Sequence, residues 1–488
     1  MEKYILAIDQ STTGTKAVLF DSKLNLFRRV TEYHNQYYPK DGWVEHDPKE
    51  ILTKTLQACR KLLTDVDARN ILAVSITNQR ETAMLWNKDG DPLYNAIVWQ
   101  CQRGRQICQR LRDLGYGKIV REKTGLIIDP YFSASKITWL LENVQGLKSK
   151  IQNERAFFGT IDTWLIWNLC ENHPHVTDFS NASRTLLLNI HSLKWDEEML
   201  EIFGINPQIM PSLRFSDEIF GYTNLNGILP RKVPVIGVMG DSSAALYGQM
   251  GHNHGDAKAT YGTGTSIMIN VGKDKPLLES GVLSIGWANS NQVTYVAEGN
   301  IHSSGDTLKW LVDQLGLLSS VEEIEELVNC VEDNGGVYFV PAFSGLGAPY
   351  WDNDARALVC GMNKRTNKAH FVRAAVESIA YQVHDLFSTL VEETKIKPSH
   401  LRVDGGATKS RFLMQFQADI LNLPVLVNNI EECSARGVAL VAAAEIGVIE
   451  PRQVSTDYTE YLPRMAPQTR EKYLKEWQTA VKRAILHQ

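Results

Sequence analysis

The sequence predicts an α/β protein of two domains. The chain has 488 residues, more than one hydrophobic core usually supports. A strand, a short polar loop and a second strand follow one another early in each half, at 4–20 and 257–270. Near the middle, an apolar stretch rich in β-branched residues (233–238) leads through Met239 and Gly240 into a run suited to a helix start, the pattern of a buried strand followed by a helix.

Asp241 stands directly after that central strand. Open α/β sheets bind their ligands at the carboxyl ends of such strands. Asp is also a preferred N-cap residue, so a purely structural cap is the alternative for this stretch taken alone. The other polar loops of the chain favour the ligand-binding interpretation.

The composition is that of a soluble globular protein, with 43% hydrophobic and 22% charged residues. The formal net charge of -5 argues against nucleic acid as a partner, because phosphate backbones require clustered positive charge. We find no apolar run long enough for a membrane helix and no signal peptide at the start. Seven scattered cysteines predict reduced, mostly buried thiols and hence a cytoplasmic protein. The histidine pairs at 173/175 and 252/254 lack an evident third ligand, so we predict loops without metal there.

Three small polar loops follow predicted strands. The first, residues 9–16 (DQSTTGTK), combines hydroxyls, a glycine and Lys16, which are the components of a phosphate-binding loop. The second bends at Gly262, Thr263 and Gly264, and the third, residues 401–407 (LRVDGGA), sets two glycines after a short strand. Each loop alone is compatible with a plain turn, but the three together favour a nucleotide site.

Polar and aromatic residues between the first loop and Asp241 suit a polyhydroxylated ligand. Arg80 and Glu81 end a predicted strand (71–76) and offer donors and acceptors side by side; the alternative is a surface ion pair of little value. Trp99 and Tyr131 are candidates for an apolar wall, although such rings are more often core. We assign Leu140, Trp164 and Trp167 to the core.

Later segments complete the predicted elements. Apolar residues recur every three or four positions at 309–331 and 370–391, which predicts helices. The loop at 341–351 is too long for a turn and suggests a binding or packing role, and a solvated amphipathic helix is expected at 470–483. The glycine-rich run at 248–255 is the predicted boundary between domains.

At this point the sequence resembles the FGGY carbohydrate kinases, and within them the members that phosphorylate glycerol. The resemblance covers nearly the whole chain and includes both family signatures, around Lys136 and Trp139 and around Gly361 and His370. The other stretches that carry it are 42–48 (GWVEHDP), 77–82 (TNQRET), 95–100 (NAIVWQ), 129–133 (DPYFS), 159–164 (GTIDTW), 339–352 and 403–406 (VDGG).

The resemblance implies two ribonuclease-H-like domains of the actin and hexokinase type flanking a cleft. Residues 1–250 would form the N-terminal domain, with the substrate side and the catalytic base, and residues 251–488 the C-terminal domain, with the nucleotide side. It further implies ATP and Mg²⁺ as cofactors, Asp241 as the catalytic base and Asp9 as the metal position. The implied substrate contacts are Arg80, Glu81, Trp99, Tyr131, Asp241, Ser242 and Ser266, and the implied nucleotide contacts are Thr12, Thr13, Lys16, Gly262, Thr263, Gly305, Lys309, Gly406, Ala407 and Ser410.

Two departures from the family pattern concern the substrate. Ser242 stands where the glycerol-phosphorylating members have Gln, and Ser266 stands where they have a Phe that packs on the substrate carbons. A missing ring removes roughly 150 to 250 Å² of apolar contact, so the site is expected to be wider and more polar. Smaller departures, near the nucleotide, are Ser11 for Gly, Lys309 for Gln and Ser410 for Asn.

The expected reaction is ATP-dependent phosphorylation of a primary hydroxyl of a small polyol, with glycerol to glycerol 3-phosphate as first choice. The alternative is a four- or five-carbon polyol, ketose or sugar, as Ser242 and Ser266 suggest. A nucleotide-switch protein without a small substrate is a competing hypothesis, but it leaves Arg80, Glu81 and Trp99 without a purpose. We expect no membrane or nucleic-acid partner, and a homodimer or homotetramer.

Overall fold

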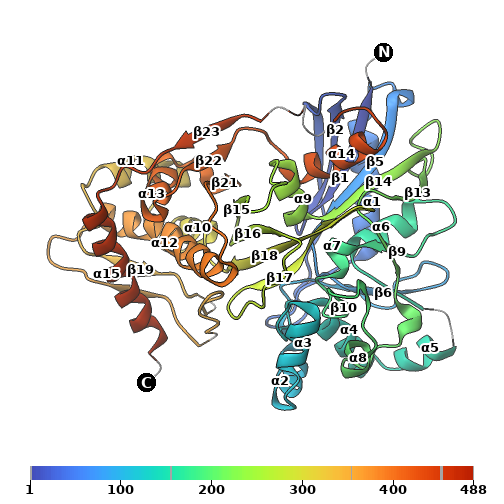
Figure 1. The fold of residues 1–488 in the computed structure, drawn as a ribbon, viewed down its shortest axis with the longest axis horizontal. Helices are drawn as coiled ribbons and strands as arrows, with labels where there is room; N and C mark the ends of the chain where they lie inside the picture. Colours follow the sequence, from blue (N-terminus) through green and yellow to red (C-terminus); the bar gives the residue numbers. More distant parts are fainter. Residues whose placement is uncertain are drawn as a thin grey trace. The chain divides into compact units, whose positions relative to one another are not determined.

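The computed structural model describes residues 3–153, 156–343, 345–352, 354–450, 454 and 456–486. The chain forms two compact units (Figure 1). Unit 1 holds Met1–Met250, Leu283–Tyr295 and Glu431–Ser455, and unit 2 holds Gly251–Val282, Val296–Ile430 and Thr456–Gln488. The predicted division into 1–250 and 251–488, with its assigned roles, stays a prediction, and two later segments pack with the first unit rather than the second.

Unit 1 is built on a six-stranded mixed sheet in the order β13-β14-β5-β1-β2-β3. β1 pairs parallel with β5 and antiparallel with β2, and β14 pairs parallel with β5. β1 and β14 are almost fully buried, which explains their continuous apolar sequence. The strands are β1 (Tyr4–Gln10), β2 (Gly14–Asp21), β3 (Leu26–Tyr33), β5 (Ile71–Asn78), β13 (Ile219–Thr223) and β14 (Val233–Gly240).

Helices cover this sheet and bring distant parts of the sequence together. α14 (Cys433–Glu445) comes from the far end of the chain, yet it packs on β1, β5 and β14 and against α9 (Asp241–Gly248) (Figure 1). The core contains Trp86, Trp164 and Trp167, and Leu140 is also fully buried. The other helices of unit 1 are α1 (Pro48–Leu62), α2 (Arg105–Asp113), α3 (Gly117–Thr124), α4 (Ser133–Asn143), α5 (Leu147–Asn153), α6 (Ile161–Leu169), α7 (Phe179–Ala182) and α8 (Glu197–Ile202).

The central part of unit 2 repeats the same plan. Its main sheet has the order β17-β18-β16-β15-β21-β22-β23, in which β15 pairs antiparallel with β16 and parallel with β21. β16, β15, β21 and β22 therefore match β2, β1, β5 and β14 in order and direction. The strands of this sheet are β15 (Ala257–Tyr261), β16 (Thr265–Gly272), β17 (Val282–Ala288), β18 (Val293–Ile301), β21 (Leu401–Asp404), β22 (Val425–Asn428) and β23 (Tyr458–Tyr461). Residues 283–295, which include most of β17 and the start of β18, belong to unit 1. The helices of unit 2 are α10 (Gly305–Asp313), α11 (Ile324–Asn329), α12 (Lys368–Thr394), α13 (Arg411–Leu421) and α15 (Pro467–Ile485).

The predicted strands and most predicted helices are confirmed, with two corrections. The helix expected at 309–331 is interrupted, because Gly316 adopts a left-handed φ of 60° after α10 and a second helix starts only at Ile324. The surface ion pair considered for Arg80 and Glu81 is wrong, since both side chains are buried. All seven cysteines are free thiols, and five of them are buried. Among the described residues, no helix is long and apolar enough to cross a membrane.

Candidate active site

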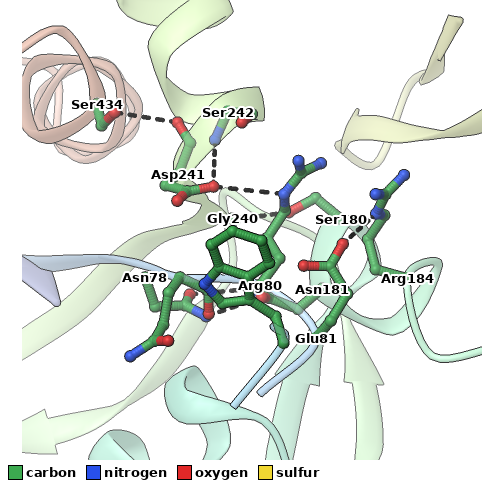
Figure 2. Close-up of polar contacts among 12 residues, drawn as sticks. Asn78, Arg80, Glu81, Ser180, Asn181, Arg184, Gly240, Asp241, Ser242 and Ser434 are labelled. Carbon is green, nitrogen blue, oxygen red and sulfur yellow. Dashed lines mark hydrogen bonds and ion pairs between the residues drawn. The ribbon is translucent and has the colours of Figure 1, made fainter. Parts of the chain in front are cut away.

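Asp241 is the first residue of α9, at the carboxyl end of β14 (Figure 2). The N-cap position belongs to Gly240, so the capping alternative for Asp241 is not what the structure shows. One carboxylate oxygen, Oδ1, accepts the backbone N–H of Ser242 at 2.6 Å, and the Ser434 hydroxyl of α14 donates to the Asp241 carbonyl at 3.0 Å. The side chain is 41% exposed. The backbone is thus fixed from two sides while the carboxylate stays accessible.

Arg80 lies against Asp241 and is placed by a glycine. Its Nε is 3.3 Å from Asp241 Oδ1, and its side chain is only 4% exposed. A Cβ atom at Gly240 would lie 2.5 Å from both Cγ and Cδ of Arg80. Because Gly240 has no side chain, the aliphatic part of Arg80 can pass beside it and its guanidinium reaches the Asp241 carboxylate.

Glu81 is held by a second buried arginine. Arg184 Nε donates to Glu81 Oε1 at 2.5 Å, and the two side chains are 1% and 2% exposed (Figure 2). Glu81 also has a left-handed φ of 61°. This conformation is uncommon for residues other than glycine, and residues that adopt it cluster at functional sites. Arg80, Glu81 and Arg184 thus place charge of both signs beside the Asp241 carboxylate.

Buried polar residues hold the strand ends that carry Arg80 and Asp241. The Asn78 and Asn181 amides exchange hydrogen bonds of 2.9 and 3.1 Å, and the Ser180 hydroxyl accepts the Gly240 N–H at 2.9 Å (Figure 2). Ser180 and Asn181 in turn donate to Asp178, whose pKa burial raises to about 6. A fully paired polar network fixes geometry more firmly than isolated contacts do.

Trp99 and Tyr131 form a partly exposed aromatic pair rather than core. Their ring centroids are 5.5 Å apart at an angle of 64°, and Trp99 Nε1 donates to the Thr12 hydroxyl at 3.0 Å. Lys136 holds the turn that carries Tyr131, because its buried ammonium donates to the carbonyls of Pro130 at 2.7 Å and Tyr131 at 2.5 Å. Burial lowers the pKa of Lys136 to about 8.

The first predicted phosphate loop connects β1 and β2 and carries Asp9 and Lys16 at its ends. Burial raises the pKa of Asp9 to about 7, against the nearby Lys16 charge, while the Glu432 and Asp241 carboxylates add to the rise. Lys16 Nζ lies 2.7 Å from Glu432 and 4.0 Å from Asp9. Although burial opposes it, the pKa of Lys16 is raised by these carboxylates. Thr13 is exposed at the tip of the loop.

The second loop lies in unit 2, between β15 and β16. Gly262 and Thr263 are exposed, and a Cβ at Gly262 would meet no atom within 3.4 Å. The start of α10 is attached to this loop, because Gly305 N–H donates to the Gly262 carbonyl at 3.0 Å and Asp306 N–H to the Thr263 carbonyl at 3.2 Å. Gly305 therefore supports the loop directly, and its predicted nucleotide contact stays a prediction.

The third loop follows β21 and begins with Gly405 at a φ of 100°. Gly406 is exposed with open space where a side chain would be, and Ala407 is half-buried. The Ser410 hydroxyl has structural partners, since it caps α13 by accepting Leu413 N–H and donates to Glu325 at 2.8 Å. Exposed Lys309 lies on α10. The nucleotide roles of these residues stay predictions.

The two serines that depart from the family pattern lie in different units. Ser242 is half-buried in the first turn of α9. Ser266 is half-buried on β16 opposite Thr260, and its hydroxyl oxygen is buried without a hydrogen-bond partner among the described residues. Their predicted effect on the substrate stays a prediction.

Comparison with known proteins decides the family. The model described as the FGGY family of carbohydrate kinases, N-terminal domain, matches residues 4–248, and the C-terminal domain model matches residues 257–446. The chain belongs to the FGGY family of carbohydrate kinases. This FGGY kinase is 55% identical to glycerol kinase 1 of Thermotoga maritima over 490 residues, covering 99% of both chains.

Solved structures agree with the fold. The crystal structure of Plasmodium falciparum glycerol kinase with ADP matches with a TM-score of 0.93 at 36% identity, covering 100% of this chain and 99% of that one. Gluconate kinase from Lactobacillus acidophilus matches with a TM-score of 0.87 at 23% identity, a likeness of fold alone. The predicted pair of ribonuclease-H-like α/β domains is confirmed for this FGGY kinase.

Reasoning from the sequence missed three residues around the site of this FGGY kinase. Arg184 holds Glu81, Glu432 holds Lys16, and Ser434 holds the backbone of Asp241. Each lies between 103 and 416 positions from its partner. No local pattern predicts such contacts. The paired Glu431 and Glu432 before an apolar helical run fit an ordinary helix start, because acidic residues are favoured there.

Proposed function

We propose that this FGGY kinase transfers the γ-phosphoryl group of ATP to a primary hydroxyl of glycerol, giving glycerol 3-phosphate. One observation carries the proposal: the accessible Asp241 carboxylate lies 3.3 Å from buried Arg80, at the strand end where Arg184 also fixes Glu81. The identity of 55% to a glycerol kinase over 99% of both chains supports glycerol as the substrate.

The acceptor-side residues have complementary tasks in this proposal. Arg80 donates hydrogen bonds to substrate oxygens and Glu81 accepts them, so together they orient a vicinal diol. Trp99 and Tyr131 face the carbon backbone. Because their partners fix these side chains in advance, binding costs less conformational entropy than it would for mobile side chains.

Asp241 accepts the proton of the attacking hydroxyl. The transition state of phosphoryl transfer is loose, so the main demands on the protein are positioning and neutralisation of charge. The hydroxyl loses its proton to Asp241 as its oxygen bonds to the γ-phosphorus, and the bond from that phosphorus to the bridging oxygen of ADP breaks. Arg80 keeps the carboxylate oriented towards the acceptor throughout.

The loops with exposed backbone and hydroxyl groups are the proposed nucleotide contacts. Thr12, Thr13 and Lys16 in unit 1 would bind phosphate oxygens, as would Gly262 and Thr263 in unit 2. The further proposed contacts are Gly305, Lys309, Gly406, Ala407 and Ser410. Gly406 has open space where a side chain would be, and a Cβ at Gly262 would come no closer than 3.6 Å to another atom. Such room is what close approach of a ligand to the backbone requires.

Asp9 fits a Mg²⁺ position. Its carboxylate is 7% exposed, and its oxygen atoms are of the ligand type that Mg²⁺ prefers. Burial raises its pKa to about 7, so a cation that restores the ionised form is a favourable neighbour. Mg²⁺ bound with the nucleotide would supply charge neutralisation for the phosphates.

The cytoplasmic location and the homodimer or homotetramer stay predictions.

A second candidate substrate is a four- or five-carbon polyol, ketose or sugar. The observation in its favour is the Ser266 hydroxyl, which is buried without a partner among the described residues. A substrate with an additional hydroxyl would satisfy it, because an unpaired buried polar group is costly.

The test is a panel of three- to six-carbon polyols, ketoses and sugar acids, each scored by kcat/KM with ATP. We expect glycerol to rank first and Asp241→Asn to lower kcat about 10²- to 10⁴-fold, with the Kd of ATP unchanged by calorimetry. Preference for a larger acceptor would select the second candidate. ATP turnover that ignores every acceptor, or normal turnover by the variant, would overturn both.

A further inference from the structure

A separate cavity lies in unit 1, beside the end of α9 that is remote from Asp241. Its volume is about 210 Å³, well above the share of one water molecule. Tyr247 of α9 contributes one wall, the end of α14 another, and the turn after β17 a third. The lining residues include Ser216, Asp217, Tyr247, Trp287, Asn289 and Glu445.

Two aromatic rings form one corner of this cavity. The centroids of Tyr247 and Trp287 are 5.1 Å apart, with the ring planes at 84°. Trp287 is only 7% exposed, and burial raises the pKa of Tyr247 to about 12, so its ring stays a neutral phenol. Perpendicular aromatic walls attract cations through the negative faces of the rings.

Two carboxylates face the same cavity without a cation. Asp217 and Glu445 both line it, and neither forms an ion pair with a lysine, arginine or histidine in the part of the chain that the structure describes. Burial raises the pKa of Asp217, and the Glu445 charge adds to the rise. Glu445 is also the last residue of α14, where the helix dipole is negative as well. Among the described residues that line the cavity, the charged side chains are therefore both acidic.

The walls are fixed before any ligand binds. Ser216 N–H donates to the Ala288 carbonyl at 2.8 Å, and the Ser216 carbonyl accepts Val238 N–H at 3.1 Å. The Ser216 hydroxyl donates to Asp178 at 3.1 Å. The Asn289 side chain accepts two backbone N–H groups of its own turn. A preformed site of this kind binds with a small ordering cost.

We propose that this cavity binds a small organic cation, a protonated amine or a quaternary ammonium group, between the Tyr247–Trp287 corner and the carboxylates of Asp217 and Glu445. Aromatic walls with nearby carboxylates are the chemistry that recognises such cations. A bare metal ion fits less well, since among the described residues no three His, Cys, Asp or Glu side chains gather as ligands.

The site has a direct connection to the catalytic end of the unit. Tyr247 and Asp241 lie on the same helix, roughly 9 Å apart along its axis at 1.5 Å per residue. α14 links the two as well, because Glu445 lies at its end and Ser434 in its first turn contacts Asp241. A ligand in the cavity would therefore contact both helices that hold the Asp241 backbone, whichever acceptor the kinase phosphorylates.

The experiment compares tetramethylammonium with tert-butanol, a neutral molecule of similar shape, on the full chain by ligand-detected NMR. Neither probe resembles the diol proposed for the acceptor site. We expect tetramethylammonium to bind at least about fivefold more tightly than tert-butanol, and Asp217→Asn with Glu445→Gln to weaken it about tenfold. Glu201→Gln, at an exposed carboxylate of α8, is the matched control and should change nothing.

Ring variants locate the site. Tyr247→Phe keeps the aromatic wall and should bind the cation normally, whereas Tyr247→Leu should weaken binding, with thermal unfolding as the check that each variant is folded. Equal affinity for the two probes, unchanged binding by the double carboxylate variant, or binding of Ca²⁺ that excludes tetramethylammonium would each overturn the proposal.

Discussion

A Cβ atom at Gly240 would lie 2.5 Å from the Cγ and Cδ atoms of Arg80. The position of the Arg80 guanidinium beside Asp241 therefore requires that residue 240 have no side chain. Because Gly240 has an ordinary φ of -60°, a larger residue there is tolerated by the backbone but not by Arg80. The contact between Arg80 and Asp241 is therefore the interaction that Gly240 protects.

Gly240→Ala is expected to displace Arg80 while the protein stays folded. Loss of a charge-assisted contact is worth about 1.5 to 3 kcal/mol, which lowers kcat/KM for the acceptor roughly 10- to 100-fold. The check is a double-mutant cycle with Arg80→Ala: in that background Gly240→Ala should cost almost nothing more. Additive losses would show that Gly240 acts through another residue.

Arg184 is expected to govern the acceptor KM through Glu81. Arg184→Met removes the 2.5 Å partner of the buried Glu81 carboxylate, and breaking a buried ion pair costs about 3 to 5 kcal/mol. We therefore expect a lower midpoint of urea unfolding and a higher KM for the polyol, with the KM for ATP nearly unchanged. The double variant with Glu81→Gln should recover stability but not acceptor binding, and recovery of neither would contradict this assignment.

Residue 437, where α14 crosses α9, is expected to tolerate no side chain. A Cβ at Gly437 would lie 2.0 Å from the Ala244 carbonyl oxygen, so Gly437→Ala must push the helices apart and draw Ser434 away from Asp241. Overpacking of this kind costs about 1 to 3 kcal/mol or more, measurable by chemical denaturation, and kcat should fall as well. The control is Gly117→Ala, where no atom lies within 4 Å and stability should hold or rise slightly.

The sequence was sufficient for the features that are encoded locally. The change from an apolar strand to a small, hydroxyl-rich helix start placed Asp241 correctly, and the three glycine or hydroxyl loops follow strands as predicted. The partners of these residues follow from tertiary packing instead. Arg184 meets Glu81 across 103 positions and Glu432 meets Lys16 across 416, distances over which no periodic pattern carries information.

The interrupted helix shows a different error, in which a local pattern predicted one continuous helix where the structure has two. Apolar spacing continues from 309 to 331, but Gly316 takes a left-handed conformation that ends the helical path. Periodicity reports which face is buried and not whether the backbone is continuous. Likewise, the sequence does not predict the burial of Arg80, because charged residues are normally exposed. Its close packing against Gly240 is seen only in the structure.

His46 is expected to make stability depend on pH. The side chain is fully buried against His34, with ring centroids 4.6 Å apart, and burial, with the neighbouring His34, lowers its pKa to about 3. The unfolded chain binds the proton near pH 6.5 and the folded chain does not, so the stabilisation is complete above pH 6.5 and is lost as the pH falls towards 3. The free energy of unfolding should change by up to about 1.4 kcal/mol per pH unit in this range.

His46→Gln removes that titration and should flatten the curve of unfolding free energy between pH 4 and 6.5, as measured by urea denaturation at each pH. His191→Gln, at an exposed histidine, is the matched control and should leave the slope as it is. An unchanged slope in the His46 variant would show that other groups account for the pH dependence.

Ser242 and Ser266 are expected to set how large an acceptor the kinase accepts. Ser266→Phe combined with Ser242→Gln restores the larger side chains of the glycerol-phosphorylating pattern and is expected to exclude an acceptor with an extra hydroxymethyl group. One additional carbon in a fitted pocket is discriminated about 10- to 200-fold, so the ratio of kcat/KM for glycerol to that for a four-carbon polyol should rise at least about tenfold. Ser266→Ala removes the unpaired hydroxyl without filling space. The ratio should stay nearly unchanged if glycerol is the substrate, whereas a specific loss of kcat/KM for the four-carbon polyol would show that the hydroxyl binds the larger acceptor. If the double variant keeps the original ratio, the two serines do not set the size of the acceptor.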